Sequence, residues 1–316
     1  MRTVLDVTEA AHSRGGVGRW TSGLARGLEA LNPGHVSLDV PETHPGVQGA
    51  VPAARSLPAP PWTRVPFFRR FLHRAGYLES TREKRIQRFL GTPDVIHLSG
   101  VQPFGRGRVR MVTFYDDTPW TAPETHTETT LLFARRLEAL IRGGASVLAI
   151  SGWSARRAAG LFGIAAERIS VAGGAADDHF SPGEPDPGVM LALGLQPRGY
   201  LLHVGSFVPR KNIPFLEECF RSAQVPGLRL VLAGAEEWGA EGSKHSGEVT
   251  VVKKADEKTL VSLYRGARAV LVPSSEEGLG LTVLEALACG IPVVASDGGA
   301  LPETVDGAGL VLPALD

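Results

Sequence analysis

Apolar, β-branched stretches alternate with helical patterns along the whole chain. Runs such as "TVLDV", "DVIHLS" and "ASVLAI" occur in the first half, and "YLLHVG", "LRLVLAG" and "RAVLVP" occur in the second. Continuously apolar strands separated by helices are typical of parallel sheets that helices cover on both faces. The pattern therefore predicts an α/β protein.

The length of the chain predicts two domains. The chain has 316 residues, and one domain usually takes roughly 100–200 residues. The segment "SPGEPDPG", from Ser181 to Gly188, combines proline, glycine and acidic residues and suits an exposed linker. We therefore expect one α/β domain over residues 1–182 and a second over residues 183–316.

Composition and charge exclude several classes of protein. Hydrophobic residues make up 43% of the chain and charged residues 21%, which is typical of a soluble globular enzyme. The formal net charge of +0 argues against a nucleic-acid partner.

Strand-like residues follow Met1 directly, which leaves no room for a signal peptide and predicts a cytoplasmic protein. Cys219 and Cys289 lie inside helical patterns, so we expect both in the core and neither in a disulfide or a metal site.

One stretch has an open role. Residues 41–66 are rich in proline and lack periodicity, and the stretch that follows interleaves basic residues with Phe67, Phe68 and Phe71. One interpretation is a basic amphipathic surface over residues 64–88 that contacts a membrane or an anionic acceptor. The other interpretation is a solvated helix face.

The segment from Ser274 to Ser296 combines a strand end, a glycine-rich loop and a helix. Gly278 and Gly280 let the backbone approach a ligand closely, and a helix is expected from near Thr282. A helix that follows a parallel strand directs its free N–H groups into the crevice above the sheet. This geometry suits an anion such as a diphosphate.

Two carboxylates accompany this loop. Glu277 lies in the loop and Glu285 near the start of the helix, so both could face one ligand. Each carboxylate can accept two hydrogen bonds from vicinal hydroxyls, which suits a sugar for Glu277 and a ribose for Glu285. The alternative is that Glu285 only complements the helix dipole and that Glu276 and Glu277 are solvated.

The run "EEGLGLTVLEALACGIPVVASDGGALPETV" resembles the signature of the retaining glycosyltransferases of family 4, which have the GT-B fold. The segments "SRGGVGRWTSGLARGLEAL", "VTFYDDTPW" and "LLHVGSFVPRKNIPFL" are also similar to segments of that family. The resemblance implies two Rossmann-like domains whose parallel sheets face a central cleft, with acceptor binding in the first domain and nucleotide-sugar binding in the second. Relatives continue through further helices after the point where this chain ends, so we expect the C-terminal closing helices to be missing.

The resemblance also implies site residues. It assigns catalytic roles to Glu277, which would hold the donor sugar, to Lys211 and Arg210, which would neutralise the diphosphate, and to Tyr115. The donor-binding residues that it implies are Gly15, Gly16, Ser206, Lys254, Gly278, Leu279, Gly280, Leu281, Thr282 and Glu285.

Other positions are less clearly defined. Many relatives have histidine at Tyr115 and arginine at Ser206, and these two departures put catalytic efficiency in doubt. Asp116 and His97 are expected on the acceptor side, although His97 equally suits a packed core position at a strand end. His203 is expected to be packed. No Asp-x-Asp pair is visible, so we expect no metal and no other cofactor besides the nucleotide sugar.

These expectations give one predicted function with two alternatives. The prediction is a retaining, metal-independent transfer of a hexose from a nucleotide diphosphate sugar, of the GDP-mannose or UDP-glucose type, to an acceptor hydroxyl. The acceptor would be a glycan, a lipid-linked or a small molecule, as in polysaccharide or glycoconjugate synthesis. One alternative is a nucleotide-sugar-binding protein with weak or no turnover. The other, a nicotinamide-dependent oxidoreductase, is disfavoured because "GGVG" departs from the Gly-x-Gly-x-x-Gly pattern.

Overall fold

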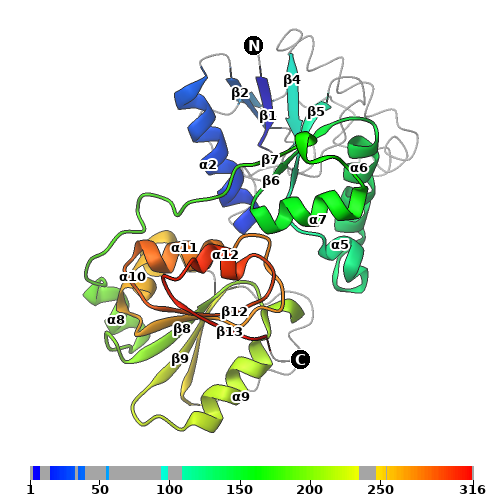
Figure 1. Ribbon diagram of the computed structural model, residues 1–316. Coiled ribbons are helices and arrows are strands. Elements are labelled where there is room, and N and C mark those ends of the chain that lie inside the picture. The colour runs from blue at the N-terminus through cyan, green and yellow to red at the C-terminus, as the bar shows by residue number, and fades with distance from the viewer. Residues whose placement is uncertain are drawn as a thin grey trace, which may run out of the picture. The chain divides into compact units, whose positions relative to one another are not determined.

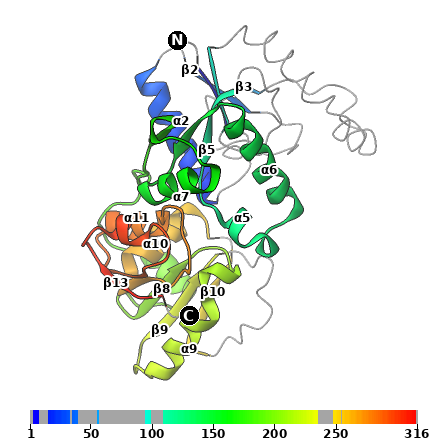
Figure 2. The ribbon, with the colours of Figure 1, turned by 45° about the vertical axis from the view of Figure 1, so that its right-hand side comes forward.

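The chain divides into two compact units, Met1–Gly174 and Ala175–Asp316 (Figures 1 and 2). The computed structural model describes residues 3–7, 15–32, 35–39, 55–56, 94–98, 109–234, 247–253 and 255–314. The basic surface expected over residues 64–88 and the donor-binding role expected for Lys254 lie outside the described residues, and both stay predictions. No helix in the described ranges is long and apolar enough to cross a bilayer.

The N-terminal unit is built on one parallel sheet. Its strand order is β3-β2-β1-β4-β5-β6-β7, and each pair of neighbouring strands is parallel. The strands are β1 (Thr3–Asp6), β2 (His35–Asp39), β3 (Arg55–Ser56), β4 (Val95–Leu98), β5 (Val109–Phe114), β6 (Ser146–Ala149) and β7 (Ile169–Val171). The α/β class expected from the apolar runs is confirmed here.

Helices cover both faces of this sheet. Adjacent residues of β1 point to opposite faces: Val4 packs in a cluster with helices α6 (Glu128–Arg142) and α7 (Gly152–Phe162), and Leu5 packs with helix α2 (Gly16–Leu31). Figure 1 shows α2 on the side of the strands away from α6. Short helical turns follow β5 and α7, namely α5 (Thr118–Thr121), Pro123–Thr125 and Ala166–Arg168.

The C-terminal unit repeats this plan. Its parallel sheet has the order β10-β9-β8-β11-β12-β13. The strands are β8 (Tyr200–Val204), β9 (Arg229–Ala233), β10 (Val249–Val252), β11 (Ala269–Val272), β12 (Val293–Ser296) and β13 (Leu310–Leu312). The strand order reverses direction between β8 and β11, and ligands of open α/β sheets bind at the carboxyl ends of the strands at such a point.

The helices of the C-terminal unit also lie on both faces. One face carries the larger core with α8 (Pro187–Leu193), α10 (Glu257–Gly266), α11 (Leu281–Ala288) and α12 (Leu301–Val305). Helix α9 (Ile213–Ala223) packs on the other face (Figure 1). Cys289 is buried in the larger core as expected, but Cys219 is exposed on α9, so the core prediction for Cys219 is wrong.

The connection between the units begins earlier than the sequence suggested. We expected the boundary between residues 182 and 183, but residues from Ala175 onward belong to the C-terminal unit. Phe180 is buried in the C-terminal core, and Arg265 donates from Nε to the carbonyl of Ser181 at 2.9 Å. Asp186 then caps α8 through Val189 N. The segment is therefore attached to the C-terminal unit near both ends, while Pro182, Gly183 and Glu184 between them are exposed, as expected of a linker.

A charged constellation at the carboxyl edge of the C-terminal sheet

Lys211, Arg210 and Glu277 meet at the carboxyl ends of neighbouring strands. Lys211 and Arg210 lie in a short 3-10 helix, Pro209–Lys211, in the connection after β8, and Glu277 lies in the loop after β11. Lys211 Nζ donates to Glu277 Oε1, and Arg210 Nη1 donates to Glu277 Oε2 at 3.1 Å. The structure therefore brings together three of the four predicted catalytic residues.

This constellation is largely withdrawn from solvent. Glu277 and Lys211 are each 8% exposed. Burial alone would raise the pKa of Glu277, but the positive charges of Lys211 and Arg210 outweigh it and lower the pKa to about 2. The carboxylate is therefore ionised at neutral pH and paired through both oxygens. The prediction that Glu277 is a solvated loop charge is excluded.

Backbone contacts hold the Glu277 loop. Ser275 N donates to the carbonyl of Arg210 at 2.8 Å, and Ala300 N donates to the carbonyl of Glu277 at 2.8 Å. Gly299 adopts φ +66°, and a Cβ there would overlap the carbonyl oxygen of Glu277 and lie 2.7 Å from its nitrogen. Glycine at 299 is therefore required by close backbone approach, a role that sequence reasoning missed although the glycine pair in "SDGGA" signalled a tight contact.

The described helices of eight or more residues differ at their N-termini. Helices α6, α7 and α10 have side-chain caps from Thr127, Ser151 and Asp256, each accepting a backbone N–H hydrogen bond. Helices α2, α9 and α11 have no such bond from their N-cap residues Gly15, Asn212 and Gly280. Side-chain caps satisfy the N–H groups that an external anion would otherwise bind. At or just before the start of each of these three helices lie residues to which the family resemblance assigns donor-binding or catalytic roles.

Helix α11 begins one residue before the expected start. Leu281 is its first residue, and Gly280 precedes it at φ +86°. A Cβ at Gly280 would lie 2.9 Å from Leu301 Cδ2. Gly278 and Leu279 are buried in the loop, and Leu281 and Thr282 are half-buried at the first turn of the helix. Their donor-binding roles stay predictions that this geometry accommodates.

Glu285 has a partner that the sequence did not reveal. Its side chain is fully buried, and Oε2 accepts a hydrogen bond from the hydroxyl of Tyr264 on α10 at 2.7 Å. Glu285 is therefore an acceptor in the core of the unit, whereas Glu277 belongs to the constellation at the strand ends. A ribose can reach Glu285 only if the atoms around it move.

Tyr115 is fixed within the N-terminal unit. Its hydroxyl lies 3.1 Å from Thr21 Oγ1 on α2, and its ring packs edge-on against Trp20 with centroids 5.7 Å apart. Gly15 and Gly16 are exposed at the start of the same helix. The roles expected for Tyr115, Gly15 and Gly16 stay predictions.

Asp116 and His97, which were expected on the acceptor side, both make local structural contacts. Asp116 accepts hydrogen bonds from the backbone N and hydroxyl of Thr118, at 3.1 and 2.6 Å, and so organises the start of α5. His97 is 3% exposed, and its Nε2 lies 2.9 Å from Thr113 Oγ1. Burial lowers the pKa of His97 to about 4, which keeps the ring neutral at pH 7. For His97 the burial and the contact with Thr113 support the packed interpretation, and the acceptor-side role stays a prediction.

His203 and Ser206 lie on and after β8. His203 is fully buried as expected, and its Nδ1 lies 2.9 Å from the carbonyl oxygen of Leu271. Burial lowers the pKa of His203 to about 4. Ser206 is half-buried and follows Gly205 at the strand end, where a donor-binding role stays a prediction.

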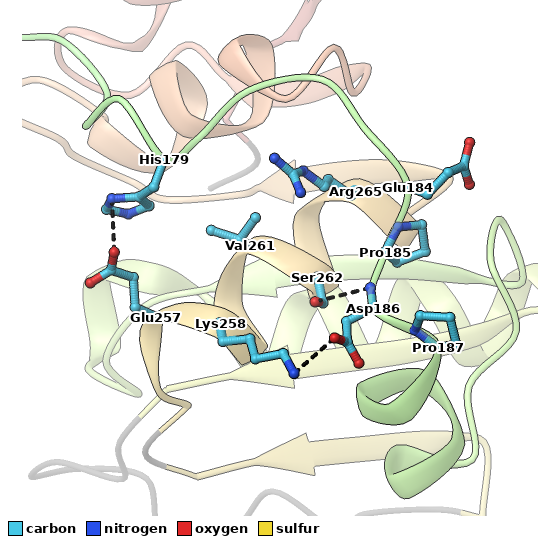
Figure 3. Close-up of a pocket in the computed structure, with 10 residues that line it drawn as sticks. All are labelled: His179, Glu184, Pro185, Asp186, Pro187, Glu257, Lys258, Val261, Ser262 and Arg265. Carbon is cyan, nitrogen blue, oxygen red and sulfur yellow. Dashed lines mark hydrogen bonds and ion pairs between the residues drawn. The ribbon is translucent and has the colours of Figure 1, made fainter.

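A cavity of about 700 Å³ lies elsewhere in the C-terminal unit, between the segment that enters it and helix α10 (Figure 3). Its charged side chains pair with one another, as His179 with Glu257 at 3.0 Å and Lys258 with Asp186 at 2.8 Å. Ser262 accepts from the backbone N of Asp186. The lining therefore serves to fasten the segment to α10, and we do not assign the donor to this cavity.

Family models match both halves of the chain. The model for glycosyl transferases group 1 matches residues 194–312, and the model for glycosyltransferase family 4 matches residues 14–179, more than half of the chain. The chain belongs to glycosyltransferase family 4. Within the described residues, no group of three or more His, Cys, Asp or Glu side chains is placed to hold a metal ion.

Curated relatives of this family 4 chain include a mannosyltransferase and a glycosyltransferase. O-antigen chain mannosyltransferase B of Escherichia coli is 30% identical over 214 residues, which cover 64% of this chain and 56% of that protein. D-inositol 3-phosphate glycosyltransferase of a Mycobacterium species (strain JLS) is 36% identical over 144 residues, which cover 40% of this chain and 31% of that protein. The matched region thus spans about half or less of the length of these relatives.

Solved structures establish the GT-B fold of this family 4 chain. Sucrose-phosphate synthase from Thermosynechococcus elongatus has a TM-score of 0.70 at 21% identity, covering 100% of this chain and 87% of that one. HepE of Anabaena, in complex with UDP-glucose, has a TM-score of 0.70 at 16% identity, covering 99% of this chain and 85% of that one. At such low identities these structures show the fold alone.

Proposed function

We propose that this glycosyltransferase moves a hexose from a nucleotide diphosphate sugar to an acceptor hydroxyl, with retention of the anomeric configuration and without a metal. The observation that carries the proposal is the constellation of Lys211, Arg210 and Glu277 at the strand ends. Membership of family 4 and the helix α11, which has no side-chain cap, support it.

The proposed chemistry needs positive charge at the leaving group. When the bond between the sugar C1 and the phosphate oxygen breaks, the diphosphate gains negative charge. Lys211, Arg210 and the backbone N–H groups at Leu281 and Thr282 would bind this charge, and fixed cations and dipoles stabilise it more in the transition state than in the ground state. These groups supply what a divalent metal supplies in other sugar transferases.

Retention follows from attack on the same face. The acceptor oxygen forms the new bond to C1 on the side from which the diphosphate departs, and the proton of the acceptor hydroxyl passes to the departing phosphate oxygen. Glu277 orients the sugar through its hydroxyls and does not form a bond to C1. Each bond broken is thereby matched by one formed, with no oxidant or other co-reactant.

The pairing of Glu277 suggests an order of events. Its two oxygens are engaged by Lys211 and Arg210 in this structure. A diphosphate would compete for the same two cations and release the carboxylate toward the sugar hydroxyls. Diphosphate binding would therefore precede and assist sugar recognition.

For the donor we propose GDP-mannose first and UDP-glucose second. The name of the Escherichia coli relative, a mannosyltransferase, supports the first, and the complex of HepE with UDP-glucose supports the second. The acceptor would be a hydroxyl of a growing glycan, a lipid-linked sugar or a small molecule. We also propose that Glu285 recognises the ribose of the donor. The reaction would serve polysaccharide or glycoconjugate synthesis.

A panel of nucleotides tests donor binding. Thermal unfolding would be followed with UDP, GDP, ADP, UDP-glucose and GDP-mannose, all at one concentration. A ligand that binds only the folded protein and is present at about a hundred times its dissociation constant adds about 2.7 kcal/mol to its stability. We expect one base to stabilise the protein and the others to have little effect. No shift with any of the five would refute the proposed donor class.

A turnover assay distinguishes the proposed transferase from a nucleotide-sugar-binding protein with weak or no turnover. That alternative is favoured by Tyr115, which stands where many relatives have histidine. The protein would be incubated with donor labelled in the sugar, with and without mannose-containing or glucose-containing acceptors. Release or transfer of labelled sugar supports the transferase. Tight donor binding without either product would establish the binding protein instead.

A further inference from the structure

Tyr264 and Glu285 form a buried polar pair between two helices of the C-terminal unit. The Tyr264 hydroxyl donates to Glu285 Oε2 at 2.7 Å, and both residues have no exposed surface. Tyr264 belongs to α10 and Glu285 to α11, which pack on the same face of the sheet. A hydrogen bond to a carboxylate is charge-assisted and therefore stronger than one between neutral groups.

The ring of Tyr264 is held on its other side. Phe180 packs edge-on against it, with ring centroids 5.5 Å apart and an interplanar angle of 88°. Phe180 is itself buried, and it belongs to the segment with which the chain enters the C-terminal unit. Packing therefore holds the ring of Tyr264 independently of the hydrogen bond that its hydroxyl makes to the carboxylate.

We propose that Tyr264 is a positioning residue for ribose recognition: its hydroxyl fixes the plane of the Glu285 carboxylate. The inference rests on the proposed role of Glu285 toward the ribose. A carboxylate held in one orientation loses less conformational entropy when it accepts the 2′-hydroxyl and 3′-hydroxyl than one that rotates freely. Because Glu285 is closed off from solvent in this structure, the phenol also keeps that orientation while the surrounding atoms open to admit the donor.

The same core offers a matched control. The hydroxyl of Tyr200 donates to the carbonyl of Leu263 at 2.7 Å, and Tyr200 is also fully buried. Tyr200→Phe therefore removes a buried hydroxyl from the same cluster without touching a carboxylate. Any loss caused by disturbing the core should occur in Tyr200→Phe as well as in Tyr264→Phe.

Titration calorimetry with ribonucleotides and deoxyribonucleotides tests the proposal. Dissociation constants would be measured for UDP, GDP and ADP, each beside its 2′-deoxy counterpart, on wild type, Tyr264→Phe, Tyr200→Phe and Glu285→Gln. We expect Tyr264→Phe to reduce the preference for ribose over deoxyribose at least threefold while leaving the affinity for the deoxynucleotide unchanged. Tyr200→Phe should keep the wild-type preference.

The possible failures can be told apart. If Glu285→Gln reduces the preference but Tyr264→Phe keeps it, the inference about Tyr264 is refuted and the role of Glu285 stands. If Tyr264→Phe weakens ribonucleotide and deoxynucleotide equally, the tyrosine has only a structural role. If Glu285→Gln keeps the wild-type preference, or if none of the nucleotides binds, the proposed contact between Glu285 and the ribose fails, and the inference fails with it.

Discussion

Helices α10 and α11 lie on the same face of the C-terminal sheet, but their N-termini are built differently. At α10, Asp256 is the N-cap, and its carboxylate accepts the backbone N–H of Thr259 at 2.8 Å. At α11, the N-cap is Gly280, which has no side chain to offer and stands in a left-handed conformation. The carboxylate in the loop before α11, that of Glu277, pairs with Lys211 and Arg210.

We infer from this difference that the start of α10 serves stability and that the start of α11 serves binding. A side-chain cap stabilises the helix by about 1 kcal/mol but occupies the N–H groups that an anion would use. The glycine start of α11 gives up that stabilisation, and we propose that its N–H groups bind a ligand instead. Helix α9 of the same unit also lacks a side-chain cap, so we place the diphosphate where an uncapped helix start lies next in sequence to Glu277 and its cations, at α11.

The largest expected effect is at the loop before α11. Glu277→Gln removes the charge that orients the donor sugar, and we expect turnover to fall at least about a hundredfold, as for other electrostatic groups that act in the transition state. Because the substitution also frees Lys211 and Arg210, the affinity for the nucleoside diphosphate should be kept or increased. Transfer of labelled sugar and titration calorimetry measure the two effects.

The adjacent Glu276 provides the control for that substitution. Glu276→Gln changes the same kind of side chain one position earlier, and turnover should stay within a few-fold of wild type. Equal loss of turnover and diphosphate affinity in Glu277→Gln would contradict the division of roles between the carboxylate and the cations.

The next prediction is the pH dependence of stability that arises from His203 on β8. His203 has a pKa of about 4 in the folded protein, against 6.5 in the unfolded chain. Below pH 6.5 the unfolded chain binds a proton that the folded protein does not, so this contribution to stability is complete above pH 6.5 and is lost as the pH falls toward 4. The free energy of unfolding should fall by about 3 kcal/mol over this range through His203 alone.

Chemical denaturation at pH 7.5, 5.5 and 4.5 measures this dependence. His203→Gln should flatten it relative to wild type, and the remaining slope should include the share of His97, whose pKa is also lowered to about 4. An unchanged slope in His203→Gln would show that the histidine is not neutral in the folded protein.

A third prediction concerns the helix start itself. Gly280→Asp places a carboxylate at the N-cap of α11, where it would compete with a diphosphate and repel it. We expect the diphosphate to bind at least about tenfold more weakly. Gly280→Ala carries the same strain from φ +86° and from Leu301 without the charge. Calorimetry on both variants isolates the charge, and equal affinities in the two would contradict ligand binding at this end.

The smallest effect is expected from the converse substitution at α10, which removes a cap instead of adding one. Asp256→Ala removes the cap, so the free energy of unfolding should fall by about 1 kcal/mol. Donor affinity should not change, because that helix start is proposed to serve stability only. Thermal unfolding measures the loss of stability, and calorimetry on the same samples measures the donor affinity. A loss of donor affinity in Asp256→Ala would contradict the assignment of different roles to the two helix starts.

Local patterns predicted the elements better than they predicted the contacts. Continuous apolar runs and glycine-bounded helices predicted the α/β class and the start of α11 to within one residue, because backbone geometry and burial leave periodic signals. The family resemblance placed Lys211 and Glu277 in one site, but it did not predict that they pair with each other. These residues are 66 positions apart in sequence, so their contact follows from the strand order, with β8 beside β11.

The failures have the same origin. Composition suggested an exposed linker over Ser181–Gly188, but it did not reveal that Arg265 holds Ser181 on the C-terminal unit or that the preceding Phe180 is buried there. The bond between Tyr264 and Glu285 joins two helices whose residues carry no shared local pattern. Both contacts arise from packing between residues far apart in the sequence, and short sequence motifs carry no information about such packing.

The most direct test of the account is the affinity of nucleoside diphosphates for Lys211→Met. Calorimetry with UDP and GDP, and with the corresponding nucleosides, would compare this variant with wild type and with Lys258→Met. Lys258 pairs with Asp186 on the surface of the same unit and serves as the control. We predict that Lys211→Met weakens diphosphate binding at least tenfold and leaves nucleoside binding and the control unchanged. Equal diphosphate affinity in Lys211→Met and wild type would contradict a diphosphate site at the constellation.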